Sequence, residues 1–193
     1  MGSLTEEYTA DLRDRLTAAF RWTDVGPGMT HLVSDVSGWW RDRQLLAEIG
    51  PALAALFPEV TPTVIAGPEA SGFIVGPLVA WELGAGFVQA FRSGERAIAG
   101  ETLARTAPVD YRGRTVTFQV LTRHLGPDDQ VLVVDDWAET GAQLVALRDL
   151  IVAAGASYLG AAVIVDGCDG GTREDLNLRG LLTRADLAHP PST

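Results

Sequence analysis

The sequence predicts an α/β protein with a mostly parallel, twisted sheet flanked by helices. Short apolar runs bounded by turn residues alternate with stretches of helical length, and this order is typical of strand–helix–strand units. The 193 residues are enough for one domain with a hydrophobic core. Their 47% apolar and 21% charged content is close to that of an average globular protein. We therefore expect a single domain over residues 1–193.

The N-terminal elements are predicted to be helical. Ser3-Leu4-Thr5-Glu6 has the spacing of a capping box. Apolar residues then recur at every fourth position, as on one buried stripe of an amphipathic helix: Tyr8, Leu12, Leu16 and Phe20. Gly26-Pro27-Gly28 ends this helix, and a second helix is expected over about residues 41–57. We assign residues 1–40 to an N-terminal helix and a small hood.

The rest of the chain predicts the sheet. Buried strands are expected over residues 63–67, 87–91, 131–134 and 158–165, an alternating strand over 115–122, and helices over 73–83 and 140–154. Residues 92–114 are rich in glycine and charge and weakly periodic, so we predict a mobile loop or an excursion hairpin. The residues after 165 are predicted to form a loop and a tail.

Composition excludes several classes of function. The net charge of −10 and the lack of a basic run argue against a nucleic-acid partner. No apolar stretch approaches the roughly 20 residues of a membrane helix, and the polar start does not resemble a secretory signal. We therefore expect a cytoplasmic protein without a membrane partner. One cysteine and three scattered histidines indicate no disulfide and no metal site made of side chains alone.

The strongest chemical signal is the turn that follows the predicted strand Val131–Val134. That strand leads directly to Asp135 and Asp136, and Thr140-Gly141-Ala142 then begins a helix. Small residues and unpaired N–H groups at a helix N-terminus can hold a phosphate, while the carboxylates suit ribose hydroxyls, hydrated Mg²⁺, or both. Helix capping alone is the competing interpretation of the same residues.

This turn resembles the diphosphate-sugar signature of the type I phosphoribosyltransferases. Asp135, Asp136, Thr140, Gly141 and Ala142 fit the family pattern, whereas Glu139 and Gln143 depart from it. The resemblance implies a type I phosphoribosyltransferase-like core with a mobile lid loop over residues 92–114. It also implies a site for the 5′-phosphate of the donor, formed by Glu139, Thr140, Gly141, Ala142 and Gln143. Glu139 would repel that phosphate unless its side chain points away or pairs with a cation.

The resemblance extends over roughly residues 5–165 and is closest to the adenine phosphoribosyltransferase branch. Gly67 to Phe73 resembles the diphosphate loop of that branch, Asp35-Val36-Ser37 a segment beside the base, and Asp110-Tyr111 the Glu-Tyr of the catalytic loop. The implied diphosphate-binding residues are Glu69, Ala70, Ser71 and Arg92. The implied base-binding residues are Leu32, Ser34 and Phe73, and the implied catalytic residues are Asp110, Asp135 and Asp136. For Leu32 and Phe73 an apolar connector and a core position are the competing interpretations, and Trp137 is expected to pack.

The implied reaction transfers the phosphoribosyl group from phosphoribosyl diphosphate to a purine or related base. Mg²⁺ is expected as cofactor, held through the donor and water near Asp135 and Asp136 without a direct protein site, and a homodimer is expected by resemblance. Ser71, Phe91 and Glu95 stand where that branch has basic residues. These departures favour a second hypothesis, a non-catalytic protein of the same fold that senses a nucleotide or the donor. A third hypothesis is a biosynthetic enzyme with an unusual acceptor. The arginines of the predicted lid either compensate for the missing cations or belong to a solvated loop: Arg96, Arg105, Arg112 and Arg114.

Overall fold

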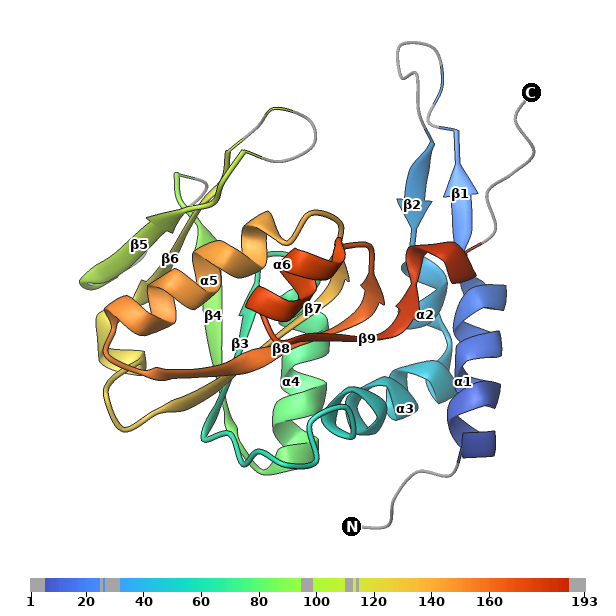
Figure 1. Cartoon of the computed structure of the whole chain (residues 1–193), viewed down its shortest axis with the longest axis horizontal. Helices are drawn as coiled ribbons and strands as arrows, with labels where there is room; N and C mark the ends of the chain where they lie inside the picture. The colour runs from blue at the N-terminus through green and yellow to red at the C-terminus, as the bar shows by residue number, and fades with distance from the viewer. Residues whose placement is uncertain are drawn as a thin grey trace.

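A seven-stranded sheet in the order β5-β6-β4-β3-β7-β8-β9 forms the centre of the protein (Figure 1). The computed structural model describes residues 6–24, 26, 32–94, 99–109, 113 and 115–187. The parallel part comprises β3 (Val64–Pro68), β4 (Gly86–Arg92), β7 (Gln130–Ala138), β8 (Ser157–Asp166) and β9 (Leu178–Thr183). Two antiparallel strands complete one edge, β5 (Thr102–Thr106) and β6 (Thr117–Leu121). The predicted α/β class is therefore confirmed.

Helices cover both faces of the sheet. α5 (Ala142–Ala153) packs on one face, while α3 (Arg43–Ala54) and α4 (Gly72–Leu83) pack on the other. α1 (Glu6–Ala19) packs against α3 and not on the sheet itself. Successive strand residues point to opposite faces, so Val131 and Val133 join the core under α5, whereas Leu132 and Val134 join the core under α4. A strand buried on both sides needs a continuous apolar run, which is what the sequence has before Asp135. Within the described part of the chain, no helix is long and apolar enough to cross a membrane.

The hood contains a short hairpin that the sequence analysis did not predict. β1 (Arg21–Thr23) pairs antiparallel with β2 (Val33–Asp35), and each strand has three residues, too few for an alternating pattern to be visible. The helix predicted over about residues 41–57 is confirmed as α3, and a short helix that was not predicted, α2 (Ser37–Arg41), precedes it. Asp42 separates them because its extended backbone lets its carboxylate cap α3 by accepting from the N–H groups of Gln44 and Leu45.

The region after residue 165 is also more ordered than predicted. It forms α6 (Gly170–Asp175), the edge strand β9 and the short helix η2 (Arg184–Asp186). β9 escaped prediction because its buried positions, Leu178, Leu181 and Leu182, do not alternate. Within the predicted lid, residues 102–106 form β5, which pairs with β6 as a hairpin. This pairing supports the excursion hairpin as the structure of this part of the region.

Candidate active site

A cavity of about 450 Å³ opens where the carboxyl ends of the neighbouring parallel strands β3 and β7 meet. Ligands bind at this edge in open α/β sheets. The lining combines the hood, the turn after β3, the end of β4, the turn after β7 and η2: Trp22, Leu32, Ser34, Glu69, Ala70, Ser71, Arg92, residues 135–144 and Arg184. Two turns predicted from sequence to lie at strand ends are therefore brought into one site.

The turn after β7 depends on a glycine at its last position before α5. Gly141 adopts a left-handed backbone (φ 73°) immediately before α5, and a Cβ added there would lie 2.6 Å from the Thr172 Cγ2 atom. A residue with a side chain would thus be both strained and obstructed. Because α5 begins at Ala142, the backbone N–H groups and partial positive charge of its first turn lie at the cavity, and the Ala142 N–H donates to the Thr140 Oγ1 atom at 3.4 Å.

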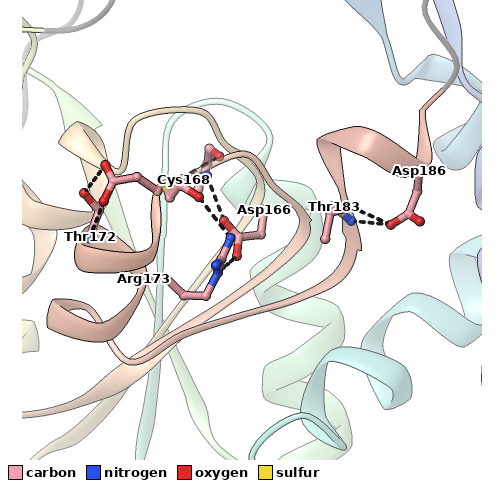
Figure 2. Close-up of polar contacts among 8 residues, drawn as sticks. Asp166, Cys168, Thr172, Arg173, Thr183 and Asp186 are labelled. Atoms are coloured by element: carbon pink, nitrogen blue, oxygen red, sulfur yellow. Dashed lines mark hydrogen bonds and ion pairs between the residues drawn. The ribbon is translucent and has the colours of Figure 1, made fainter.

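A polar network around the buried Asp166 lies next to this turn (Figure 2). Asp166 is 5% exposed, pairs with Arg173 and accepts a 2.9 Å hydrogen bond from the Cys168 N–H. Arg173 also donates to the Cys168 carbonyl at 2.9 Å, and the Cys168 thiol donates to the Ala138 carbonyl. Burial raises the pKa of that thiol to about 11, so it stays protonated at neutral pH. We assign Cys168 a structural role.

Asp135 and Asp136 are desolvated carboxylates at the base of the cavity. Asp135 is 6% exposed, and its Oδ1 accepts a 2.9 Å hydrogen bond from the Asp136 N–H. Burial raises the pKa of Asp135 well above its usual range, and the neighbouring Asp136 charge raises it further. Burial also raises the pKa of Asp136, while hydrogen bonding from the Ser71 side chain acts in the opposite direction. A site of this kind stabilises a cation or a group that develops positive charge.

We expect Asp135→Asn to raise the free energy of unfolding at pH 7 by on the order of 1 kcal/mol. A carboxylate whose folded-state pKa is raised destabilises the folded state once it ionises. The amide keeps an oxygen for the Asp136 N–H. The difference in the free energy of unfolding between the variant and the wild type, measured by denaturant unfolding, should shrink as the pH falls through the raised pKa toward about 4. The matched control is Asp128→Asn, at an exposed position; an equal gain there would contradict the assignment.

Arg92 lines the same cavity as the acidic pair and supplies positive charge there. Its backbone N–H donates to the Glu69 carboxylate at 3.0 Å, and its Nε donates to the Glu69 carbonyl at 3.2 Å. Its charge acts on Asp135 by lowering the pKa of that carboxyl. The turn after β3, which is the predicted diphosphate loop, thus holds the Arg92 guanidinium. Ser71 in the same turn brings no charge.

We expect Arg92→Ala to raise the KM for the diphosphate donor that the sequence resemblance implies by about 10-fold or more. A charge-assisted hydrogen bond is worth about 1.5–3 kcal/mol, and the variant removes the donors that would make one. Initial rates at varied donor concentration measure the effect. Arg43→Ala, at an exposed position at the start of α3, is the control; an unchanged KM for Arg92→Ala would exclude a donor contact.

Glu139 pairs with a cation, which is one of the two arrangements expected for it from the sequence. Its carboxylate forms an ion pair with Arg184 and accepts a 2.8 Å hydrogen bond from the Trp137 Nε1–H. The negative charge is therefore balanced within the protein. Trp137 packs edge-on against Trp22 with ring centroids 6.1 Å apart, so its predicted packing role holds, and it lines the cavity as well.

Two predicted residues are not among the described residues that line the cavity, Phe73 and Asp110. Phe73 is not among the described residues that line the cavity; its ring packs edge-on against Phe91 at 5.4 Å. Asp110 lies outside the described residues, together with Tyr111 and three of the four lid arginines, while Arg105 is exposed on β5. Trp22 and Arg184 line the cavity and were not predicted, because they belong to the hood hairpin and the segment after β9, both expected to be loops.

The sheet order, the acidic pair at the end of β7 and the glycine turn into α5 define the class as a type I phosphoribosyltransferase. The model of the phosphoribosyl transferase domain matches residues 42–184. The adenine phosphoribosyltransferase of Rhodococcus jostii (strain RHA1) is 35% identical over 165 residues, which are 85% of this chain and 90% of that protein. The chain belongs to the phosphoribosyl transferase family, and its relatives place it in the adenine phosphoribosyltransferase branch.

Solved structures agree with this placement. The adenine phosphoribosyltransferase of Rhodothermus marinus is 28% identical with a TM-score of 0.79, covering 90% of this chain and 99% of that one. The Saccharomyces cerevisiae enzyme, solved with an imino-altritol bisphosphate and adenine, is 26% identical with a TM-score of 0.76 and covers 90% and 99%. The fold therefore matches over nearly the full length of both.

Proposed function

We propose that this protein transfers the phosphoribosyl group from phosphoribosyl diphosphate to a nitrogen of a purine or related base. The observation that supports this most is the junction of the acidic pair Asp135–Asp136 with the glycine turn before α5 in one cavity. The relatives named above are adenine phosphoribosyltransferases, and one solved structure contains adenine. Adenine is thus the first acceptor to test.

In the proposed reaction a base nitrogen forms a bond to the anomeric carbon while the bond from that carbon to the diphosphate oxygen breaks. Diphosphate leaves with the bonding electrons, and the base loses a proton. The carboxylates of Asp135 and Asp136 stabilise the oxocarbenium-like charge that develops on the ribose. The turn Glu139–Gln143 holds the 5′-phosphate through backbone N–H groups. Positioning of the two reactants accounts for most of the remaining acceleration.

The acidic pair also fits a magnesium ion. No group of three or more His, Cys, Asp or Glu side chains is placed to hold a metal within the residues that the structure describes. Two carboxylates that need a cation, together with donor oxygens and water, form the kind of site that Mg²⁺ prefers. When bound, Mg²⁺ neutralises the charge of the leaving diphosphate. We propose Asp135 and Asp136 as the residues nearest to it.

The decisive experiment measures diphosphate release by the purified protein with Mg²⁺, donor and a panel of purines and pyrimidines. Release that depends on one of the bases is expected. If no base supports release while the protein is folded, the proposed transfer is wrong. The residues 92–114 are proposed to act as a lid that excludes water from the donor, so hydrolysis without base should be slow.

A second candidate function is favoured by one observation. The cations among the described lining residues are Arg92 and Arg184, and Arg184 is paired with Glu139, so the diphosphate end has little positive charge. A protein that senses a nucleotide would need the 5′-phosphate turn but not the diphosphate site. A thermal shift with a nucleoside monophosphate but no turnover with any base would support this alternative.

We propose a homodimer as the assembled form, located in the cytoplasm. Exposed apolar side chains on α4 support an interface: Trp81 is 89% exposed and Ile74, two turns earlier, 41%. Light scattering after size-exclusion chromatography measures the mass directly. A mass of one chain at micromolar concentration would contradict the dimer.

A further inference from the structure

Residues 166–176, which form the α6 segment after β8, contact the turn after β7 at both of its ends. Where the turn begins, the Ala138 carbonyl accepts a 2.8 Å hydrogen bond from the Gly167 N–H. Where the turn ends, the Gly141 backbone lies so close to α6 that an added Cβ would be 2.6 Å from the Thr172 Cγ2 atom. The path of the turn therefore depends on the position of the α6 segment.

The α6 segment can reach a ligand of the active-site cavity only through that turn. None of its members is among the described residues that line the cavity. Its contact with Gly141 is fixed because the Asp169 carboxylate accepts from both the N–H and the hydroxyl of Thr172, at 2.8 and 3.0 Å (Figure 2). With the hydroxyl held in this way, the Thr172 methyl group is the part that meets Gly141. A shift of α6 would thus move the N–H groups at the start of α5.

Arg173 ties α6 back to the end of β8. Its guanidinium pairs with Asp166, the last residue of β8, and donates to the Cys168 carbonyl at 2.9 Å (Figure 2). Asp166 in turn accepts a 2.9 Å hydrogen bond from the Cys168 N–H. The ion pair thus holds both backbone groups of Cys168, whose Sγ atom lies 3.4 Å from the position of an added Gly141 Cβ. Arg173 therefore reaches the turn through Cys168 and through Thr172, its neighbour in α6.

The burial of Asp166 makes this geometry specific. The Asp166 side chain is 5% exposed and that of Arg173 is 43% exposed, so the arginine reaches from the surface over a carboxylate that water hardly contacts. A buried charge without its partner is strongly unfavourable. Arg173 is therefore held where it neutralises Asp166, and α6 is held with it.

We propose that Arg173 is a positioning residue for the 5′-phosphate of the donor and of the nucleotide product. It acts through Asp166 and Cys168 on the turn, whose backbone N–H groups hold that phosphate in the proposed function. Hydrogen bonds weaken steeply when their angles depart from the optimum, so a turn that is not held in place loses affinity for phosphate. The identity of the ligand rests on the proposed function, whereas the effect on the turn does not.

The first experiment measures binding and turnover by Arg173→Met, which keeps an unbranched side chain but removes every donor. Kd values for adenosine monophosphate and ribose 5-phosphate, from calorimetry, should both rise by about 10-fold or more, the effect of losing one charge-assisted hydrogen bond to the phosphate. The KM for the donor should rise by a similar factor, whereas the KM for adenine and kcat at saturating donor should change little. A residue that only stabilises the fold would lower kcat through the fraction of active protein and leave both Kd values unchanged.

A double variant separates positioning from stability. Asp166→Asn together with Arg173→Met leaves no unpaired charge in the interior, and the amide oxygen keeps an acceptor for the Cys168 N–H. The bridge from α6 to β8 is nevertheless lost, so we expect the same rise in both Kd values. Arg173→Lys keeps the charge without the planar fork that serves two acceptors, and its Kd values should be intermediate. Unchanged Kd values in the folded double variant would overturn the proposal.

Arg179→Met is the matched control. Arg179 on β9 also pairs with a carboxylate, that of Glu59, and also donates to a backbone carbonyl, that of Leu56. It lies outside the described lining of the cavity and outside the α6 segment. Its replacement should leave the Kd values for both phosphate ligands unchanged. Equal weakening in this variant would show a general loss of stability and contradict the role of Arg173.

Hydrogen exchange tests the route through the turn without any ligand. Amides of residues 138–144 should exchange about 10-fold faster in Arg173→Met and in the double variant than in the wild type or in Arg179→Met. Weaker phosphate binding without faster exchange, or the reverse, would contradict the proposal. Both effects without turnover on any base would retain the positioning role while refuting transfer. Turnover with unchanged Kd values and exchange would refute the positioning role and leave transfer intact, and a wild type that binds neither phosphate ligand would refute both.

Discussion

Replacing Asp135 and Asp136 together by asparagine is expected to lower the rate of base-dependent diphosphate release by about 100-fold to 1,000-fold. Loss of one preorganised electrostatic group costs a factor of this size, and the pair is proposed to face the position where positive charge develops. Neither replacement changes the size of the side chain, and Asp135 is buried while Asp136 is half-buried. Single-turnover rates at saturating donor and Mg²⁺ separate this effect from weaker binding.

The loss of diphosphate release in the double variant of Asp135 and Asp136 should not result from unfolding. Burial raises the pKa of both carboxyls, so the neutral amides relieve a desolvation cost in the folded state. The double variant should be at least as stable as the wild type at pH 7. Unchanged turnover in a folded double variant would refute the role given to the pair.

Gly141→Ala is expected to weaken binding of a nucleoside monophosphate by about 10-fold or more. A left-handed alanine costs about 1–2 kcal/mol. The added Cβ would also lie 2.6 Å from Thr172 Cγ2 and 3.0 Å from Leu176 Cδ1, so the turn must shift relative to α6. Such a shift moves the N–H groups at the start of α5, which are proposed to hold the phosphate. Calorimetric titration with adenosine monophosphate measures the change.

Gly84→Ala is the matched control for this variant. Gly84 has φ 65° at the end of α4, and an added Cβ there meets nothing within 4 Å. Both variants should lose about 1–2 kcal/mol of stability from the strained backbone, and Gly141→Ala should lose more because of its steric clash. Only Gly141→Ala should lose nucleotide affinity. Equal affinity in the two variants would show that the turn before α5 does not hold the phosphate.

Local patterns were sufficient for most of the sheet and for half of the site. The apolar run before Asp135 predicted β7 because a strand buried on both faces must be apolar throughout. The turn Thr140-Gly141-Ala142 predicted the start of α5 because glycine at a left-handed position is a local requirement. Each of these signals depends on neighbours in the sequence and needs no knowledge of the remaining fold.

The other half of the site depends on contacts between distant segments. Arg184 meets Glu139 across 45 positions of the chain, a separation that follows from the two residue numbers, and no local pattern encodes such a pair. Trp22 reaches the cavity because a hairpin with three-residue strands places it against Trp137. Phe73 follows the predicted diphosphate loop in sequence, and its ring packs on Phe91. This packing agrees with the core position that was the competing interpretation of Phe73.

By itself, the sequence determined the α/β class, the acidic pair at the end of β7 and the glycine turn into α5, because these follow from the period of burial and from the backbone freedom of glycine. Only the tertiary structure decided how the charge of Glu139 is balanced and which groups line the cavity. The reason is physical: a charge is neutralised by whatever lies within about 4 Å of it, and folding, not sequence order, sets that distance.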